Sequence, residues 1–463
     1  MPYDQALLSP TIFRAYDIRG IVGETLTEDS VRLIGQAFGS LVQEEGETHV
    51  VVARDGRLSG PTLSKALIEG ICQSGCHVTD IGMAPTPLLY FATVKLPQHA
   101  GVMLTGSHNP SNYNGLKMVM QGKALAEVQI QTLYQRIIEK RLSQGAGIVT
   151  ERDLTAQYAA EMLDQIQLKR PLNIVIDSGN GVAGQLAPML FRKMGCDVHE
   201  LFCEVDGHFP HHHPDPSQPE NLQALIRAVR ENKADIGLAF DGDGDRLGAV
   251  TSDGDIVWPD RILMLFAKSL LAKHQNAKII YDVKCTHHLA ILIKQLGGEA
   301  IMWKTGHSFI KAKLAEINAA IAGEMSGHFF FKDRWYGFDD ALYAGARLLE
   351  ILAEQTKQSA ALFAEIPDSV STAELKVAVS DEEKFQLMQR LTDEANFSDA
   401  KDINTIDGLR INFADGWGLI RPSNTTPYLV LRFEAINETI LKNIQDLFRV
   451  WMLSVKPDLV LPF

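Results

Sequence analysis

Three aspartates at alternate positions form the densest group of side chains that could do chemistry in this sequence. They occur in Ala239-Phe-Asp241-Gly-Asp243-Gly-Asp245-Arg246. The intervening glycines allow the chain to curl, so that the three carboxylates can converge on one hard cation. Without a cation, the clustered negative charges would repel and raise one another's pKa. The pattern therefore predicts a site for one divalent metal ion per chain.

The identity of that metal follows from the ligand types. A calcium loop of the EF-hand type is excluded, because it requires glycine at its sixth position and glutamate at its twelfth, where this sequence has Arg246 and Ser252. Few ligands, all of them oxygen, favour Mg²⁺, which keeps some waters and accepts a phosphate oxygen. The structural alternative is a solvated acidic turn. The apolar residues 236–240 argue against it, since they place the aspartates at the end of a strand.

A serine hydroxyl is presented at the end of a second apolar segment. The segment reads Ala100-Gly-Val-Met-Leu-Thr-Gly-Ser-His-Asn-Pro110, with Ser107 and His108 in a loop. Gly106 permits tight backbone approach, and Pro110 pushes the residue before it into an extended conformation. Asn114-Gly115 then predicts a turn before a strand at residues 116–120. A loop serine is most often a turn residue, but this position also suits a nucleophile.

Two further loops carry groups that could bind a substrate. In Gly323-Glu324-Met-Ser326-Gly-His328 the polar side chains alternate, so an extended backbone would point all three the same way. Such a set could bind sugar hydroxyls or move a proton, and a loop without a partner is the alternative. Lys304-Thr-Gly306-His307-Ser precedes a predicted helix at residues 309–317. Its backbone N–H groups suit an anion, although an ordinary turn has the same pattern.

A third loop near the C-terminus has the composition of a phosphate site. Arg421-Pro-Ser423-Asn424-Thr425-Thr-Pro427 combines a guanidinium, hydroxyls, an amide and loop N–H groups. A polar turn fixed by two prolines is the alternative. The histidine-rich stretch at residues 207–216 could hold a transition metal. We favour a structural loop near the cleft, because its prolines impose a rigid extended backbone without helical ligand spacing.

The elements that must position these loops repeat three times. Each copy is a strand, an aspartate, a polar loop, a helix, a glycine and a strand, beginning with strands at residues 48–53, 173–176 and 278–281. The aspartates are Asp55, Asp177 and Asp282. Such βαβ units imply largely parallel sheets with ligands at the carboxyl ends of the strands. We predict three related α/β domains with mixed, largely parallel sheets, at residues 1–151, 152–255 and 256–367.

The ends of the chain differ from these copies. Residues 368–463 contain no fourth copy, and strands near 375–379 and 429–433 with a final helix near 438–452 predict an α+β domain. In the opening segment, apolar and charged residues alternate from Phe13, and Arg19-Gly20 ends the run in the manner of a loop.

Bulk composition excludes several classes of partner. Among 463 residues, 57 acidic side chains outnumber 44 basic ones, and the formal charge of −13 argues against nucleic acid. A small phosphorylated substrate is not excluded, because a local cluster of basic side chains decides binding inside a cleft. No apolar run has the roughly 18 residues of a membrane span, and the start lacks a secretory pattern. The 5 cysteines show no zinc-like pairing, which predicts a cytoplasmic protein.

Taken together, the motifs resemble the α-D-phosphohexomutase superfamily, and within it the bacterial phosphomannomutase/phosphoglucomutase enzymes. Four motifs occur in the family's order across the chain: Thr105-Gly-Ser-His-Asn-Pro110, Asp241-Gly-Asp-Gly-Asp-Arg246, Gly323-Glu-Met-Ser-Gly-His328 and Arg421-Pro-Ser-Asn-Thr425. The resemblance implies four domains around a central cleft and a phosphorylated Ser107. A phosphoseryl oxygen of Ser107 and the three aspartates would then bind Mg²⁺.

The resemblance also assigns the remaining site residues. It places Arg246, His108 and Lys117 beside the phosphoryl group. The residues that it places along the cleft as substrate-binding are Tyr16, Arg19, Lys284, Gly306 and His307. It implies that sugar hydroxyls bind Glu324 and Ser326, with His328 nearby. The residues that would hold the non-reacting phosphate are Arg421, Ser423, Asn424 and Thr425.

The implied reaction exchanges phosphate between two positions of a hexose. Phosphoserine donates its phosphoryl group to a hexose phosphate, the resulting hexose 1,6-bisphosphate turns over in the cleft, and its other phosphate returns to Ser107. The bisphosphate would also act as the activator. His328 and Lys117 are the candidates for the general base. At the third position of Gly323-Glu-Met-Ser-Gly-His328, the methionine (Met325) resembles the residue of the mannose/glucose enzymes more than that of the phosphoglucosamine mutases.

The alternatives are a phosphoglucosamine mutase, a sugar-phosphate phosphatase or phosphotransferase that uses Ser107 covalently, and a non-catalytic sugar-phosphate sensor. The intact Ser107 and the three aspartates tell against the sensor, since binding alone needs neither. The expected partners are small hexose phosphates, with no nucleic acid and no membrane, and we expect a monomer.

Overall fold

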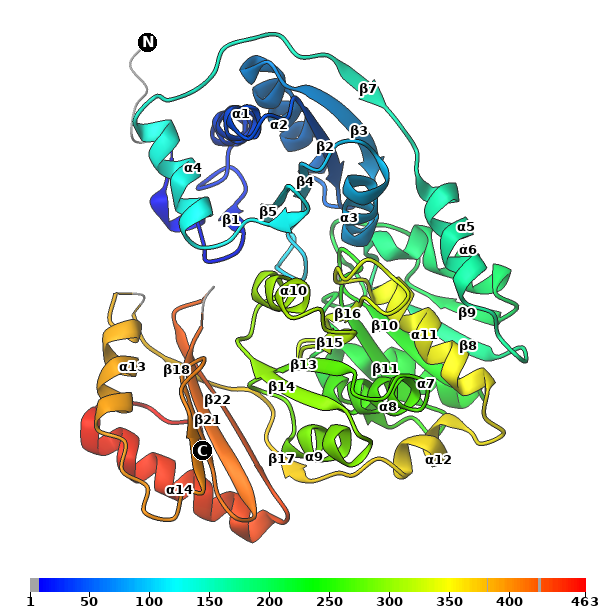
Figure 1. The fold of residues 1–463 in the computed structure, drawn as a ribbon, viewed down its shortest axis with the longest axis vertical. Helices are drawn as coiled ribbons and strands as arrows, with labels where there is room; N and C mark the ends of the chain where they lie inside the picture. Colours follow the sequence, from blue (N-terminus) through cyan, green and yellow to red (C-terminus); the bar gives the residue numbers. More distant parts are fainter. Residues whose placement is uncertain (1–7, 381, 424–425) are drawn as a thin grey trace.

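Four β-sheets, each with its own helices, organise the chain (Figure 1). The computed structural model describes residues 8–380, 382–423 and 426–463. In Figure 1 the first unit lies at the top, the second and third overlap at the lower right, and the fourth lies at the lower left. Within the described residues no helix is long and apolar enough to cross a membrane.

The first sheet has helices on both of its faces. Its strand order is β1-β5-β4-β2-β3-β7, with β6 beside β5. In β2, Val50 and Val52 pack in one core with α1 and α2, whereas Val51 and Ala53 pack in another core with α3. Successive side chains of a strand point to opposite faces, so a strand covered on both sides is apolar throughout. The elements are β1 (Ile18–Ile21), α1 (Glu28–Glu44), β2 (His49–Arg54), α2 (Gly60–Ser74), β3 (His77–Met83), α3 (Thr86–Lys95), β4 (Gly101–Leu104), β5 (Tyr113–Met120), β6 (Lys123–Ala124), α4 (Val128–Ile138) and β7 (Val149–Glu151).

The second and third sheets are smaller and share one large core with part of the first. The second sheet has the order β12-β11-β10-β8-β9, and the third β14-β13-β15-β16. The second unit contains α5 (Thr155–Gln165), β8 (Asn173–Asp177), α6 (Ala187–Lys193), β9 (Asp197–Leu201), α7 (Gln223–Glu231), β10 (Ile236–Phe240), β11 (Leu247–Thr251) and β12 (Ile256–Val257). The third unit contains α8 (Pro259–Leu271), β13 (Lys278–Asp282), α9 (His287–Gln295), β14 (Glu299–Trp303), α10 (His307–Glu316), β15 (Ile321–Gly323), β16 (Phe329–Phe331), α11 (Ala341–Ala353) and α12 (Ser359–Ala364).

These three sheets contain the same four-stranded pattern. In the first, β3 and β2 run parallel, β4 runs parallel to β2, and β5 returns antiparallel to β4. The equivalent strands are β9, β8, β10 and β11 in the second sheet and β14, β13, β15 and β16 in the third. The repeated strand–aspartate pattern therefore did mark three related mixed α/β units.

The fourth unit is built differently. All pairings in its sheet are antiparallel, in the order β17-β22-β21-β20-β19 with β18 beside β22. Helix α14 packs on β21 and β22 around a separate core. The α+β character expected of the C-terminal region is confirmed, whereas the exact domain limits stay predictions. The elements are β17 (Val370–Ser371), β18 (Leu375–Ala378), α13 (Lys384–Asp393), β19 (Asp402–Asn404), β20 (Leu409–Asn412), β21 (Gly416–Pro422), β22 (Tyr428–Ala435) and α14 (Glu438–Val455).

Two local expectations for the first unit were wrong. Asn114-Gly115 forms no turn, and Arg19-Gly20 forms no loop, because the two pairs lie opposite each other in the ladder between β5 and β1. A Cβ atom on Gly115 would lie 2.2 Å from the carbonyl oxygen of Ile18. The glycine is thus needed for close approach of two strands, a use that its local sequence does not distinguish from a turn.

Candidate active site

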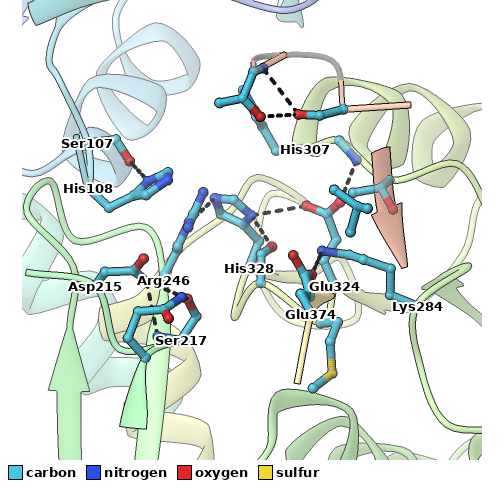
Figure 2. A pocket seen from close by; sticks show the side chains of 18 of the residues that line it. Ser107, His108, Asp215, Ser217, Arg246, Lys284, His307, Glu324, His328 and Glu374 are labelled. Atoms are coloured by element: carbon cyan, nitrogen blue, oxygen red, sulfur yellow. Dashed lines mark hydrogen bonds and ion pairs between the residues drawn. The ribbon is translucent and has the colours of Figure 1, made fainter. Parts of the chain in front are cut away.

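The three loops that carry the candidate catalytic and binding residues occupy equivalent connections in the three related sheets. Ser107 lies between β4 and β5, the three aspartates between β10 and β11, and Glu324 to His328 between β15 and β16. Ser107 and the loop from Glu324 to His328 line a cavity of about 490 Å³ that is bordered by residues of all four units (Figure 2), whereas the three aspartates are buried beneath Ser107. Although the chain carries a net charge of −13, the basic residues that line the cavity are Arg14, Arg19, Lys117, Arg246, Lys284, Lys376, Arg421 and Arg432. This local positive charge suits a phosphorylated ligand.

Ser107 is held in an unusual backbone conformation at the end of β4. Its φ is 49°, in the left-handed region that residues other than glycine seldom adopt. Its Oγ lies 3.1 Å from Nδ1 of His108 and 3.2 Å from Oδ2 of Asp241. A Cβ atom on Gly242 would lie 2.4 Å from the Ser107 carbonyl oxygen, so the serine loop packs directly on the aspartate loop.

The three aspartates fit a hard cation. All are fully buried, and one carboxylate oxygen from each lies within 4.8 Å of the others. Oδ1 of Asp243 is buried without a hydrogen-bond partner among the described residues, and Oδ1 of Asp245 lies 3.3 Å from Nε2 of His328. Gly244, with φ 75°, provides the turn that brings the carboxylates together. Buried oxygens of this kind need a positive partner, so a divalent cation is the ligand that the donor set accepts.

Neighbouring charges separate the pKa values of these groups. Burial, together with Asp245 and Asp243, raises the pKa of Asp241 well above its usual value. Burial opposes ionisation of Asp245 too, but Lys117 and His328 outweigh it and hold its pKa well below normal. Lys117 Nζ lies 2.7 Å from Asp243 Oδ2 and also contacts Asp245. These two carboxylates raise the pKa of Lys117 against the effect of its burial.

Residues 323–328 form a tight turn, so the expected extended conformation was wrong. The Glu324 N–H donates to the carbonyl of His328 at 2.9 Å, and the Gly327 N–H donates to the carbonyl of Glu324 at 3.0 Å. The turn nevertheless brings the three polar side chains together. His328 Nδ1 lies 3.0 Å from Glu324 Oε2 (Figure 2). It also lies 2.9 Å from Ser326 Oγ. Burial lowers the pKa of His328, but Asp245 and Glu324 outweigh it and raise the pKa to about 9.

Backbone contacts join the aspartate loop to both the first and the third unit. Arg246 and His328 form an antiparallel bridge, and the Leu247 N–H donates to the Gly327 carbonyl at 3.0 Å. At the start of α3, the Thr86 N–H donates to the carbonyl of Asp243 at 2.8 Å. The loops therefore form one continuous framework, although they come from three different sheets.

Other predicted residues surround this framework. Arg19 donates to Asn109 Oδ1 at 2.7 Å, and the Tyr16 ring lies 5.4 Å from that of His307. Helix α10 begins at His307, two residues earlier than expected. Gly306, with φ 134°, precedes it and donates its N–H to Glu324. These residues and His108 line the cleft.

The far end of the cleft is formed by the fourth unit. Arg421 Nε donates to Asp407 Oδ2 at 2.9 Å, while its Nη2 is buried with no hydrogen-bond partner among the residues that the structure describes. Ser423 Oγ lies 2.7 Å from Thr426 Oγ1. Asn424 and Thr425 lie outside the described residues. A buried guanidinium nitrogen of this kind suits an anion such as a phosphate.

The sequence matches one protein family along most of its length. Residues 10–144, 156–254 and 258–370 match the models of phosphoglucomutase/phosphomannomutase alpha/beta/alpha domains I, II and III, and residues 374–449 match the C-terminal domain. The chain belongs to the phosphoglucomutase/phosphomannomutase family.

Relatives within the family are similar over whole chains. The phosphomannomutase/phosphoglucomutase of Pseudomonas putida is 52% identical over 458 residues, covering 99% of each chain. The phosphoglucomutase of Neisseria gonorrhoeae is 51% identical, covering 99% of this chain and 100% of the relative. A crystal structure of a phosphoglucomutase/phosphomannomutase family protein from Burkholderia thailandensis has a TM-score of 0.94 at 52% identity, covering 98% of this chain and 100% of that one.

Sequence reasoning gave no role to three carboxylates that neutralise cations of the cleft. Glu374 Oε1 lies 2.6 Å from Lys284 Nζ, and Asp407 binds Arg421. Asp215 is the strongest of the carboxylates that raise the pKa of Arg246 against the effect of burial. Lys284 and Glu374 are 90 residues apart, so no local spacing could have indicated the pair.

The histidine-rich stretch makes structural contacts. His212 Nε2 lies 3.0 Å from Asp177 Oδ1, and the ring of His211 stacks on Phe202 with centroids 4.0 Å apart. Among the described residues, none of the three groups that could hold a metal includes a histidine of this stretch. Asp215, at its end, lines the cleft.

Proposed function

We propose that the chain is a phosphohexomutase that interconverts the 1-phosphates and 6-phosphates of mannose and glucose. One observation carries the proposal: a single cleft is lined at one end by a serine hydroxyl, which contacts the first of three buried and converging carboxylates, and at the other end by the partly unpaired guanidinium of Arg421. A hexose with two phosphate positions needs such a site at each end. Family membership and the names of the relatives at 51% and 52% identity support the same activity.

Preference for mannose and glucose rests on two further observations. A relative named probable phosphoglucosamine mutase, from Methanothermobacter thermautotrophicus, is only 36% identical over 456 residues. Met325, in the loop at residues 323–328, lines the cleft, where its thioether sulfur is only a weak hydrogen-bond acceptor for an amino group.

In the proposed reaction Ser107 carries the phosphoryl group that is transferred to the sugar. The fixed backbone of its loop aims Oγ into the cleft, and Lys117 and Arg246 supply positive charge around it. Phosphoryl transfer depends mainly on positioning and charge stabilisation. Asp241, Asp243 and Asp245 would hold Mg²⁺ with a phosphoseryl oxygen, and the ion would supply positive charge beside the transferring group.

The geometry favours His328 over Lys117 as the residue that exchanges a proton with the sugar. His328 contacts both Glu324 and Ser326, the groups that we expect to bind sugar hydroxyls. Lys117 also lines the cleft, but its amino group is held by the carboxylates of Asp243 and Asp245. The same imidazole would release its proton to a departing sugar oxygen and take one from an attacking hydroxyl, since the two half-reactions are the reverse of each other.

The bisphosphate must turn round before its second phosphate reaches Ser107. The far site must therefore accept a phosphate on either end of the sugar, which Arg421, Ser423, Asn424 and Thr425 would do without contacting the ring. Glu374 would release Lys284 to the substrate as the ligand enters. These assignments to individual residues are part of the proposal.

A coupled assay tests the function directly. The protein is given mannose 1-phosphate, Mg²⁺ and a trace of glucose 1,6-bisphosphate, and formation of the 6-phosphate is followed beside release of inorganic phosphate. We expect isomerisation without net phosphate release. Stoichiometric phosphate release would indicate a phosphatase, and binding without conversion a sensor. Parallel kinetics on mannose, glucose and glucosamine phosphates would rank the sugars.

A further inference from the structure

A buried arginine lies beneath the Ser107 loop and holds its main chain. Arg57 is 1% exposed, and its guanidinium donates to the loop from below. The acceptors are the carbonyl oxygens of Ser107 at 2.8 Å, Asn109 at 2.6 Å, Tyr113 at 2.9 Å and Pro110 at 2.5 Å. A guanidinium has five donors in a rigid plane. One side chain thus binds four main-chain carbonyls of the loop, of which that of Pro110 also accepts from the Tyr113 N–H at 3.0 Å.

A buried aspartate holds the other side of the same loop. Asp55 Oδ2 accepts from the Thr105 hydroxyl at 2.7 Å and from the Gly106 N–H at 3.1 Å. The Thr105 hydroxyl in turn accepts from the Ser107 N–H at 2.7 Å. Asp55 also accepts from Arg57, through its backbone N–H at 3.0 Å and its Nε at 3.2 Å.

Both peptide groups of Ser107 are therefore fixed by this pair. Asp55 acts through Thr105 on the N–H of Ser107, and Arg57 acts directly on its carbonyl. The φ of Ser107, which lies between these two peptide groups, is 49°, a value that is unfavourable for a residue with a side chain. Such conformations persist only where the surroundings impose them, and they gather at functional sites.

The histidine-rich stretch of the second unit closes this arrangement from behind. The Phe209 ring lies 5.2 Å from Cζ of Arg57. A Cβ atom on Gly207 would lie 2.6 Å from the Leu58 nitrogen, and one on Gly106 would lie 2.2 Å from Arg57 Cζ. The Arg57 side chain is therefore confined between the Ser107 loop and the second unit. Gly106 and Gly207 permit this close packing because they have no Cβ atom.

We propose that Arg57, oriented by Asp55, is a positioning residue for phosphoryl transfer, which holds Ser107 in the left-handed conformation that aims Oγ at the cleft. The inference rests on the proposed function. Arg57 touches no reacting atom, so its loss should lower the rate of transfer while leaving the sugar and phosphate contacts in place. A role confined to stability would instead lower the melting temperature without changing kcat of the folded protein.

The test compares three variants with the wild-type enzyme, each with Mg²⁺ and glucose 1,6-bisphosphate. Arg57→Ala removes the guanidinium, and Arg57→Lys keeps a positive charge but loses the planar set of donors. Arg136→Ala is the matched control, because Arg136 is 3% exposed in the same unit and binds Glu44 away from the cleft. Measurements are kcat, KM, melting temperature, and kcat of Arg57→Ala in added guanidinium ion.

For Arg57→Ala we expect kcat to fall about 100-fold with KM changed by about threefold at most, since small misplacements of a reacting group have effects of this size. Guanidinium ion at millimolar concentration should restore part of kcat by filling the space left by the side chain. Arg57→Lys should lose about 10-fold or more. Arg136→Ala should melt at a lower temperature with wild-type kcat.

Wild-type kcat in Arg57→Lys would overturn the inference, and so would a fall in Arg57→Ala that guanidinium leaves unchanged. If Arg57→Ala does not fold, the kcat of Arg57→Lys alone tests the inference. A wild-type enzyme that isomerises no hexose phosphate would contradict the proposed function itself, an outcome visible before any variant is made.

Discussion

The Ser107 loop and the loop at residues 323–328 occupy the same place in two related sheets, yet they are held in different ways. In each, the aspartate at the end of the neighbouring parallel strand accepts a backbone N–H from the loop. Asp55 accepts from Gly106 at 3.1 Å, and Asp282 accepts from Met325 at 3.3 Å. This shared hydrogen bond from a loop N–H to a carboxylate gives a physical reason for the aspartate at the same position in these two repeats.

The difference lies in what else holds each loop. In the first, Arg57 binds four main-chain carbonyls, and the Ser107 side chain takes no part in these bonds. In the second, the side chains of Glu324, Ser326 and His328 bind one another. A loop fixed through its main chain presents one atom accurately, whereas a side-chain network can exchange its hydrogen bonds for those of a sugar. We therefore expect the first loop to govern kcat and the second to govern substrate recognition and proton exchange.

Removing the hydroxyl of the first loop should have the largest effect. Ser107→Ala should lower turnover by about 1,000-fold or more, as expected for loss of a covalent nucleophile. Substrate should still bind, which calorimetry with glucose 1-phosphate would measure. Retained wild-type turnover would remove Ser107 from the chemistry.

A substitution in the aspartate loop should lower kcat, as a substitution of Ser107 should. Asp243→Asn removes a charge from the proposed metal site, and we expect about a 100-fold loss of kcat with the fold intact. Excess Mg²⁺ should restore part of the activity, and chelation should abolish it in the wild type. Circular dichroism provides the control for folding. Full activity of the metal-free wild type would contradict this assignment.

The phosphate site of the fourth unit should affect binding more than rate. Arg421→Ala should raise KM for the 1-phosphate and the 6-phosphate by similar factors of about 30, because loss of a charge-assisted bond has this magnitude. Kinetics in both directions would check it. An effect confined to one isomer would argue against a shared distal site.

A substitution in the second loop should separate it from the first. Glu324→Gln keeps the shape but removes the charge that faces His328, and we expect kcat/KM to fall about 10-fold, mostly through KM. The assay is steady-state kinetics beside those of Ser107→Ala. A loss confined to kcat would show that the two loops have equivalent roles.

The smallest effect concerns how the fourth unit is attached, through Glu434, which does not line the cleft. Burial raises the pKa of Glu434, but bonds from His287 and Thr286 and the charge of Arg432 outweigh it and lower the pKa to about 2. A lowered pKa stabilises the fold above the unfolded value near 4.5, and that stability is lost as pH falls towards 2. Glu434→Gln should melt about 3 °C or more below wild type at pH 7, with the gap shrinking between pH 5 and pH 3. A gap independent of pH would contradict this, whereas kcat at pH 7 should not change.

Much of this organisation could be predicted from the sequence, and the failures have physical reasons. The strand–aspartate repeat identified three related sheets because buried parallel strands are apolar throughout and their loops begin at fixed places. The roles of Asp55 and Arg57 could not be read from that pattern, since their partners lie 50 or more residues away. Gly115 was misread as a turn residue, because close approach of strands and a tight turn both require glycine.

The central claim is that a serine oxygen carries the phosphate between the two positions of the sugar. Intact-mass measurement of the protein after incubation with glucose 1,6-bisphosphate and Mg²⁺ tests it most directly, with Ser107→Ala as control. We predict one added phosphoryl group on the wild type, none on the variant, and its removal by glucose 6-phosphate. A fully active enzyme whose Ser107 is never esterified would contradict the account.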